Sequence, residues 1–154
     1  MSVLELKVPP PIVALVLALL MWLTPAVAGL VRIPYPARVL CAIVLVCIGQ
    51  SIGIAGVFAF RRAKTTVNPT KASLASSLVI QGVYRYTRNP MYLGFLLTLL
   101  LAWAIFLANP FAVLWVVVFV LYVTRFQIIP EERVLASLFG AEYEAYKARV
   151  RRWV

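Results

Sequence analysis

The sequence contains no histidine and no aspartate, and its five acidic residues face fifteen lysines and arginines. Without histidine there is no imidazole base and no Ser-His-Asp triad, and most zinc sites lose a ligand. The sequence therefore predicts no metal site and a chemistry that needs little help from a general base. Cysteine is also scarce: Cys41 and Cys47 point to different faces of one apolar segment, so no disulfide between them is expected.

Charge is sparse along most of the chain. Charged residues make up 13% of the 154 residues and hydrophobic residues 64%, more apolar surface than a soluble core of this size can bury. Three apolar blocks, Ile12–Val31, Val39–Phe60 and Met91–Thr124, are long enough to cross a hydrocarbon core of about 30 Å as helices. The sequence thus predicts an all-α polytopic protein whose surroundings are a lipid bilayer.

The third block is too long for one span, since a straight helix over it would run on the order of 50 Å. Asn109-Pro110 lies in its middle, where proline removes a backbone donor and disfavours helix at the residue before it, so a tight helical hairpin is predicted there. The result is one membrane-embedded domain over residues 1–154. Its expected parts are spans at about 12–31, 39–60, 91–108 and 110–128, a loop over 61–90 and a tail over 130–154.

Basic residues indicate the orientation. An even number of spans puts both termini on the side of the 61–90 loop, and that side carries nearly all the positive charge, whereas the opposite side has only Arg32 and Arg38. By the positive-inside rule the loop and both termini face the cytoplasm. The first block has a weak basic flank and is long for a signal peptide, so it is kept as a span. Because the basic residues follow membrane boundaries, no nucleic-acid partner is predicted.

Local patterns add three expectations. Gly49 and Gly53 have the spacing that lets two helices approach closely in lipid. From Pro130 onward apolar residues recur at helical spacing, with a break expected at Gly140. Beyond it, Glu142–Arg152 is typical of a basic amphipathic helix that lies on the membrane surface.

Two polar clusters could carry chemistry: Gly82–Tyr92 before the third span, and Pro130–Arg133 after the fourth. Each also has a plain structural interpretation, an interfacial aromatic belt for the first and a helix start for the second. The hairpin is expected to bring both clusters to one pocket, because it places the base of the third span next to the base of the fourth. Carboxylates, tyrosines and free backbone donors there suit S-adenosylmethionine, which is zwitterionic, cationic at sulfur and carries a flat ring. Its methyl group is already activated, so the protein mainly aligns an acceptor and excludes water.

These motifs resemble a known family. The segments Leu78–Tyr92, Asn109-Pro110, Pro130–Leu135, Phe139-Gly140 and Glu142–Tyr146, in this order and spacing, are similar to the integral-membrane isoprenylcysteine carboxyl methyltransferases and phospholipid methyltransferases, over about residues 61 to 152. The resemblance implies a methyltransferase that depends on S-adenosylmethionine and transfers a methyl group to a lipophilic acceptor. It further implies a short bacterial-type member, in the inner membrane, with a cytoplasmic active site.

The resemblance also implies the site residues by position. Glu131, Glu132 and Arg88 match catalytic positions, and Gln127 and Arg125 lie where the acceptor is bound. Cofactor-binding positions correspond to Ser76, Ser77, Leu78, Val79, Gly82, Tyr84, Asn89, Pro90, Met91, Tyr92 and Glu131.

Two of these positions depart from the family pattern. Asn89 replaces a family histidine, which keeps a hydrogen-bonding side chain that cannot titrate. Gln127 stands where the prenylcysteine enzymes have an arginine. The acceptor therefore stays open between a prenylcysteine-like carboxylate, a phospholipid amine and a thiol.

Two other classes of protein fit parts of the pattern. A membrane reductase that uses NADPH would have a similar C-terminal end, but the chain is short for that group. A non-enzymatic exporter or scaffold with four spans is the other alternative. Proton-coupled exporters of this size place a carboxylate within a span, whereas all five acids here lie outside the apolar blocks.

Overall fold

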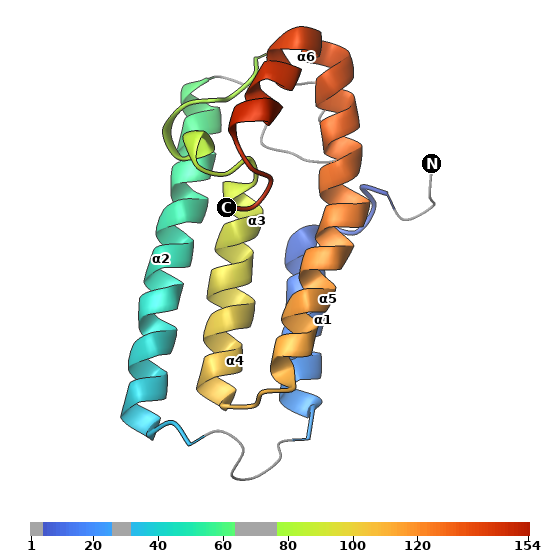
Figure 1. The fold of residues 1–154 in the computed structure, drawn as a ribbon. Coiled ribbons are helices and arrows are strands. Elements are labelled where there is room, and N and C mark those ends of the chain that lie inside the picture. The colour runs from blue at the N-terminus through green and yellow to red at the C-terminus, as the bar shows by residue number, and fades with distance from the viewer. Residues whose placement is uncertain (1–4, 26–31, 64–76) are drawn as a thin grey trace.

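The computed structural model describes residues 5–25, 32–63 and 77–154, and every regular element in these ranges is helical. Two π-helical segments, η3 and η4, join their neighbours, so that Pro90–Leu107 forms one helical rod and Ala112–Arg149 forms a second that is kinked at Gly140. With α1 and α2, these rods run side by side in alternating directions (Figure 1). The elements are α1 (Pro10–Leu23), α2 (Tyr35–Arg62), η2 (Gly82–Arg85), α3 (Pro90–Phe95), η3 (Leu96–Leu101), α4 (Ala102–Leu107), α5 (Ala112–Val123), η4 (Thr124–Ile128) and α6 (Ile129–Arg149).

Three of these helices, α2 and the two rods, are long and apolar enough to cross a membrane, and the predicted all-α polytopic fold is confirmed. The first helix differs from its prediction. It spans 14 residues and ends at Leu23, whereas a crossing needs roughly 20 residues. Residues 26–31 of the predicted first span lie outside the described residues, as do Lys64, Lys71 and Ser76 of the loop, so that span remains a prediction.

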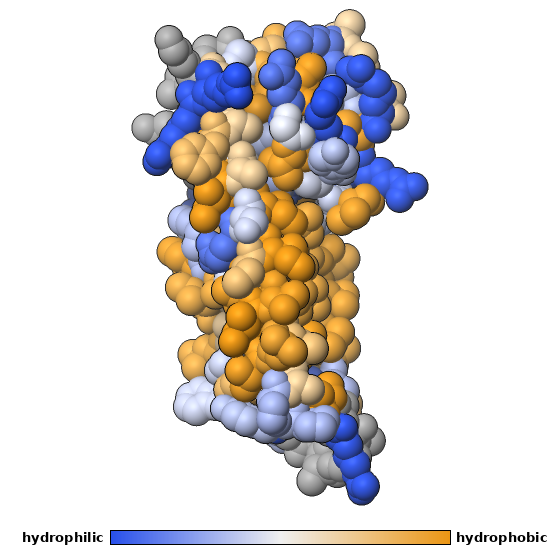
Figure 2. Space-filling model, turned by 90° about the vertical axis from the view of Figure 1, so that its left-hand side faces the viewer, coloured by the Kyte–Doolittle hydropathy of each residue, from blue (hydrophilic) through white to orange (hydrophobic). Residues whose placement is uncertain are grey.

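The helices expose large apolar side chains around the waist of the molecule. Leu40, Phe58 and Leu121 are each more than half exposed. Figure 2 shows the result as an orange apolar band between two bluer ends. Such a continuous apolar belt fits a bilayer and would be a liability in water.

The backbones of α2 and α3 are in contact at two glycines. A Cβ atom built on Gly94 would lie 2.8 Å from the carbonyl oxygen of Gly49, and one built on Gly49 would lie 2.9 Å from the carbonyl oxygen of Gly94. Neither position has room for a side chain. The close approach predicted from the glycine spacing is therefore confirmed, and it fixes α3, with Tyr92 on its first turn, against α2.

The predicted hairpin is confirmed at Asn109-Pro110. The rod ends at Ala108, which adopts a left-handed conformation with φ of 49°. The side chain of Asn109 then makes two hydrogen bonds. Its Oδ1 accepts from the N–H of Phe111 at 3.1 Å, and its Nδ2 donates to the carbonyl of Thr24 at 3.0 Å. The turn is thus tied to the end of α1, which places the next rod beside it.

The second rod passes through Pro130 without a break, although the sequence suggested that a new helix begins there. Proline cannot donate to the carbonyl four residues earlier, which leaves that of Phe126 without its helical partner. The π-helical segment Thr124–Ile128 absorbs the misfit. The Phe126 carbonyl instead accepts from the N–H of Leu6 at 3.0 Å. The rod therefore continues beyond the apolar band and carries Glu131 and Glu132 with it.

The break predicted at Gly140 is confirmed, since this residue has φ of 48° and ψ of −123° within α6. The helix resumes and ends at Arg149, and residues 150–154 turn back between the other helices (Figure 1). Tyr143 and Tyr146 in this last part are buried. One face of the predicted surface helix thus packs inward, while its placement on a membrane remains a prediction.

Gly94→Leu should destabilise the protein markedly, because its side chain would overlap the backbone of α2. Overpacking of this kind costs about 1–3 kcal/mol, so the thermal unfolding midpoint in detergent should fall by several degrees. Gly53→Ala is the matched control, since a Cβ there meets only the Cα of Gly94 at 4.0 Å. Equal midpoints for the two variants would contradict the contact between α2 and α3.

Candidate active site

Tyr92 and Glu131 meet at the polar end of the bundle, where α2 ends and α3 begins. Pro90 occupies the first turn of α3, where its missing donor costs nothing, and this places Tyr92 on the same turn. The Tyr92 hydroxyl donates to Oε1 of Glu131, on the first turn of α6. Within the described part of the chain no cation pairs with Glu131. The carboxylate is therefore held in place with acceptor capacity to spare.

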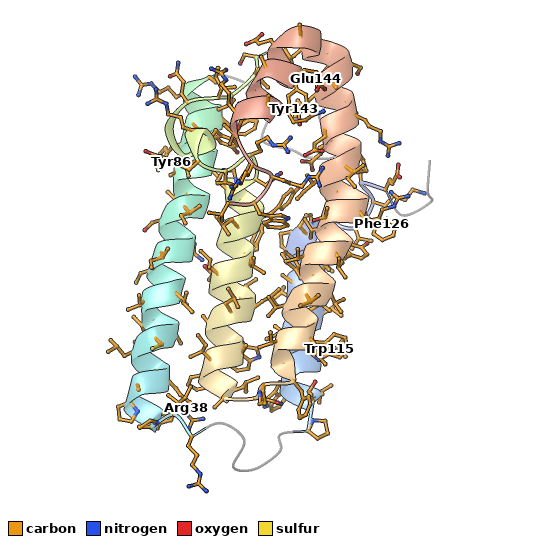
Figure 3. All side chains as sticks on the ribbon, viewed as in Figure 1. Arg38, Tyr86, Trp115, Phe126, Tyr143 and Glu144 are labelled. Carbon is orange, nitrogen blue, oxygen red and sulfur yellow. The ribbon has the colours of Figure 1, made fainter. Side chains whose placement is uncertain are left out.

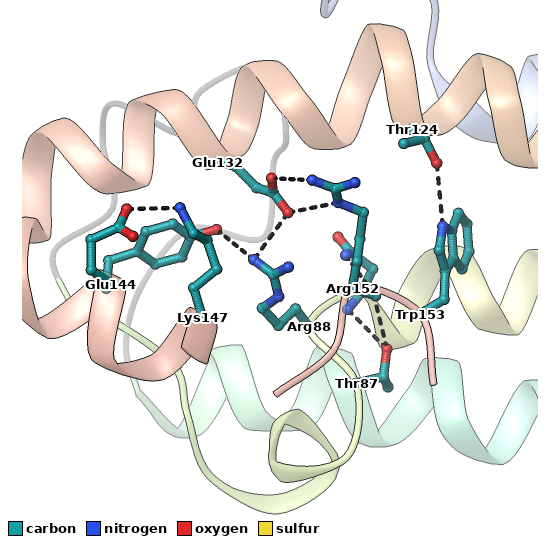
Figure 4. A network of polar contacts seen from close by, with 10 residues as sticks. Thr87, Arg88, Thr124, Glu132, Glu144, Lys147, Arg152 and Trp153 are labelled. Atoms are coloured by element: carbon teal, nitrogen blue, oxygen red, sulfur yellow. Dashed lines mark hydrogen bonds and ion pairs between the residues drawn. The ribbon is translucent and has the colours of Figure 1, made fainter. Parts of the chain in front are cut away.

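Glu132 next to it has two cationic partners (Figure 4). The Nη1 of Arg88 lies 3.0 Å from Oε1 of Glu132, and the two side chains are only 10% and 15% exposed. Arg152 binds the same carboxylate with two hydrogen bonds, from Nε at 2.9 Å and from Nη2 at 2.7 Å. Hydrogen bonding to Glu132 raises the pKa of Arg152. Paired, charge-assisted bonds of this kind hold both partners in a defined geometry.

The tail after α6 completes this network through its backbone. The Nδ2 of Asn89 donates to the carbonyl of Arg152 at 2.8 Å, and the N–H of Arg88 donates to the carbonyl of Arg151 at 3.1 Å. Trp153 then donates from Nε1 to Oγ1 of Thr124 at 3.2 Å. The tail is thus bonded both to the segment before α3 and to the second rod, and it forms one wall of the site.

Tyr84 provides an aromatic wall. Gly82 begins the turn with φ of 62°, a conformation that a side chain would strain, and η2 then buries Tyr84. The ring of Phe60 packs edge-on against it, with centroids 5.4 Å apart, and the Tyr146 hydroxyl donates to the Tyr84 carbonyl at 2.8 Å. Burial raises the pKa of Tyr84, and the nearby Tyr146 and Glu131 raise it further. Its hydroxyl therefore stays protonated at neutral pH.

The structure brings most of the predicted site residues together. Tyr84, Arg88, Asn89, Tyr92, Glu131 and Glu132 all belong to this cluster, with Gly82 and the buried Pro90 supporting it. Of the preceding stretch, Ser77 donates to the carbonyl of Ala63 at 3.2 Å and Val79 is buried, so Ser77 to Val79 is tied to the end of α2. Ser76 lies outside the described residues.

Three predicted residues lie elsewhere. Met91 lines a groove on another face of α3. Arg125 is half exposed and its Nη1 lies 2.9 Å from Oε1 of Glu5, away from the acidic pair. Gln127 is fully buried one helical turn before Glu131, and its Nε2 donates to the carbonyl of Val8 at 2.8 Å. The Oε1 of Gln127 is buried without a hydrogen-bond partner in the described residues.

The aromatic-belt interpretation fits only one of the three tyrosines in the first cluster. Tyr86 is 77% exposed, whereas Tyr84 and Tyr92 are buried. Figure 3 shows Tyr86 at the outer edge of the polar end. Because Tyr84 and Tyr92 are buried, they do not contact the membrane interface as tyrosines of an aromatic belt would.

Sequence reasoning missed the residues that the tail and α6 contribute, namely Arg151, Arg152, Trp153, Tyr143 and Tyr146. No pattern in the sequence selects Arg152 from the many basic residues as the partner of Glu132. The two tyrosines, three residues apart, did mark one face of a helix, but a face of this kind is as typical of a membrane surface as of a packed interior.

The cluster therefore combines one carboxylate without a cationic partner, one paired carboxylate, a buried guanidinium and several aromatic rings. The Nε of Arg88 is buried and has no acceptor among the described residues. In those same residues no group of three or more His, Cys, Asp or Glu lies together in a way that could hold a metal ion. Glu131 can therefore accept from a cation or a hydroxyl group, and the Nε of Arg88 can donate to an anion.

Comparisons with known proteins agree on one family. Residues 37–142 match the family model described as phospholipid methyltransferase. Two rice proteins, from the indica and japonica subspecies of Oryza sativa, are each 36% identical over 115 residues and are described as probable protein-S-isoprenylcysteine O-methyltransferases. These alignments cover 70% of this chain and 56% of each rice protein, so the chain spans about half the length of these relatives.

A Haemophilus influenzae protein, described as uncharacterized, is 52% identical over 64 residues, which is 42% of this chain and 100% of that protein. No solved structure matches the chain.

Arg152→Gln should loosen the tail, because it removes the bidentate ion pair with Glu132. Since the arginine is partly exposed, a cost of roughly 1 kcal/mol is expected, or about fivefold more opening. Trypsin should then cleave after Arg149 or Arg151 about five times faster. Lys147→Gln, which removes an exposed pair with Glu144, is the control. Equal cleavage rates in the two variants would show that the ion pair does not hold the tail.

Proposed function

The chain belongs to the phospholipid methyltransferase family, and from this premise we propose that it is a membrane methyltransferase that uses S-adenosylmethionine to methylate a lipophilic acceptor. The observation that carries the proposal is the state of Glu131. This carboxylate is positioned by Tyr92 but has no cationic partner in the described residues, although fifteen basic residues are available in the chain. A site that leaves one acid uncompensated suits a cationic ligand.

The residues present fit the cofactor by their chemistry. Glu131 would accept from an ammonium or from hydroxyl groups, and Arg88 would donate from its unpaired Nε to a carboxylate. The rings of Tyr84 and Tyr92 would contact the aromatic base or the sulfonium of the cofactor. S-adenosylmethionine supplies a methyl group that is already electrophilic.

The protein's own contribution is then mainly positional. The ion pairs of Glu132 fix Arg88 in place, and the hydrogen bond to Glu131 fixes the ring of Tyr92. Trp153, bonded to Thr124, helps the tail to close the site against water. Alignment with exclusion of water accounts for much of the acceleration that a transfer between two bound partners needs.

The acceptor would reach the site from the bilayer, and its class stays open between a prenylcysteine-like carboxylate, a phospholipid amine and a thiol. The name of the rice proteins favours the first. Gln127 does not, because a neutral amide stands one turn before Glu131 and offers no positive charge to a carboxylate.

We also propose that the site faces the cytoplasm of a bacterial inner membrane. The described basic residues near the polar end include Arg61, Arg62, Arg85, Arg149 and Arg151, while the other end has Arg32 and Arg38. This asymmetry follows the positive-inside rule.

Glu131→Gln should weaken binding of S-adenosylmethionine, measured by calorimetry on the detergent-purified protein, by about 10-fold or more. Loss of one charged partner is worth roughly 1.5–3 kcal/mol, which converts to that range. Tyr84→Ala should do the same by removing the aromatic wall. Glu144→Gln is the control, because Glu144 is an exposed acid at the same end.

If the parent protein is folded and binds neither S-adenosylmethionine nor S-adenosylhomocysteine, the proposal is wrong. Equal binding by the parent and both site variants would place the cofactor elsewhere.

A further inference from the structure

A second candidate site lies on the outer side of the contact between α2 and α3. It is a groove of about 450 Å³, within the range of about 300–1,000 Å³ common for small-molecule sites. Most of its lining is apolar, and it opens on the apolar band that would face lipid. The residues that the argument uses are Gly53, Phe58, Arg61, Gly94, Phe95 and Thr98.

The groove is separate from the candidate active site. Met91 and Phe95 line it from α3, whereas Tyr92, between them in sequence, points to Glu131. Neither Tyr84 nor the acidic pair contributes to its lining. The two sites therefore lie on different faces of the same helix.

The floor of the groove is made of glycine. A Cβ atom built on Gly53 would meet only the Cα of Gly94, at 4.0 Å, so space remains above this backbone. Phe58 and Phe95 contribute rings to its lining. A trough with a bare backbone floor and apolar side chains has the shape and polarity that suit a flexible hydrocarbon chain.

Among the described lining residues, one cation, Arg61, lies at the polar end of this trough. Arg61 belongs to the last turn of α2, is exposed, and makes no salt bridge with any described residue. Gly49 marks the deep end of the lining. Arg61 lies twelve positions after Gly49 along α2, a rise of about 18 Å, which is close to one leaflet of a hydrocarbon core about 30 Å thick.

We propose that the groove binds one phospholipid with an anionic headgroup, its phosphate at Arg61 and one acyl chain along the glycine floor. Positive charge at the membrane boundary and an apolar trough beneath it match the two halves of such a lipid. The proposal does not rest on the proposed methyl transfer. The proposed lipid lies on the outer face of α2 and α3 and remains bound to the protein.

The deep end of the groove also contains two polar groups, Gln50 and Thr98, and the Oγ1 of Thr98 is buried without a hydrogen-bond partner in the described residues. These two polar groups could instead bind a helix from a second copy of the chain, since polar side chains beside glycines promote helix association in lipid. The experiment must therefore distinguish a lipid from a second copy in the groove. The charge at Arg61 favours the lipid, because the described residues of the apolar band include no acid with which a second copy could neutralise it.

The test is native mass spectrometry of the detergent-purified protein, with phosphatidylglycerol and phosphatidylcholine of equal chain length added in turn. The parent should retain one phosphatidylglycerol and retain phosphatidylcholine at least fivefold less. Arg61→Gln should lower phosphatidylglycerol retention about fivefold, the size expected for one basic residue at a membrane surface. Arg62→Gln, its neighbour outside the groove lining, should leave retention unchanged.

Gly53→Leu gives an independent readout, because it fills the trough and should reduce retention of both lipids. Its unfolding midpoint, compared with that of Gly53→Ala, shows that it is folded. Unchanged lipid retention in both Arg61→Gln and Gly53→Leu would overturn the proposal. So would a lipid-free dimer of the parent that Gly53→Leu converts to monomer, since a second copy would then occupy the groove. Binding of S-adenosylmethionine by the same variants reports separately on the other site.

Discussion

Hydrocarbon offers backbone groups no water to bond, so each carbonyl and N–H that a helix leaves unpaired must find a partner inside the protein. The architecture follows from how this chain meets that constraint. At Pro130 the lost bond is replaced by one from Leu6, which ties the N-terminal segment to the second rod. At the hairpin, Asn109 pairs with Thr24 and ties the turn to α1. These backbone bonds and the close glycine packing of α2 against α3 together determine which helices are neighbours.

The lack of solvent also explains why carboxylates inside the protein are paired with cations. Glu5 lies between Arg125 and Arg133 at one side of the second rod, and Glu132 lies between Arg88 and Arg152 inside the bundle. Glu131 is different, because a neutral tyrosine hydroxyl is its partner. Glu142 also lacks a cationic partner among the described residues, but it is exposed to solvent, so Glu131 is the acid inside the bundle whose missing cation marks the candidate site.

Much of this could be predicted from the sequence, where a local rule decides the outcome. Asn109-Pro110 can hardly continue a helix, and the spacing of Gly49 and Gly53 points to close packing, so both predictions were confirmed. Pro130 was misleading, because its effect depends on a π-helical segment and on a donor more than a hundred residues away. The ion pair between Arg152 and Glu132 could not be predicted either, since contacts between side chains far apart in the sequence produce no periodic pattern in it.

Because residues 150–154 form one wall of the site, the site is completed only after these residues have been synthesised. Asn89 is synthesised before its partner, the carbonyl of Arg152, which lies 63 residues further along the chain. Until then the helices can insert and pair, but Glu132 lacks one of its cations. Insertion of the helices is thus uncoupled from completion of the polar end, and a nascent chain lacks the finished site until residues 150–154 have been made.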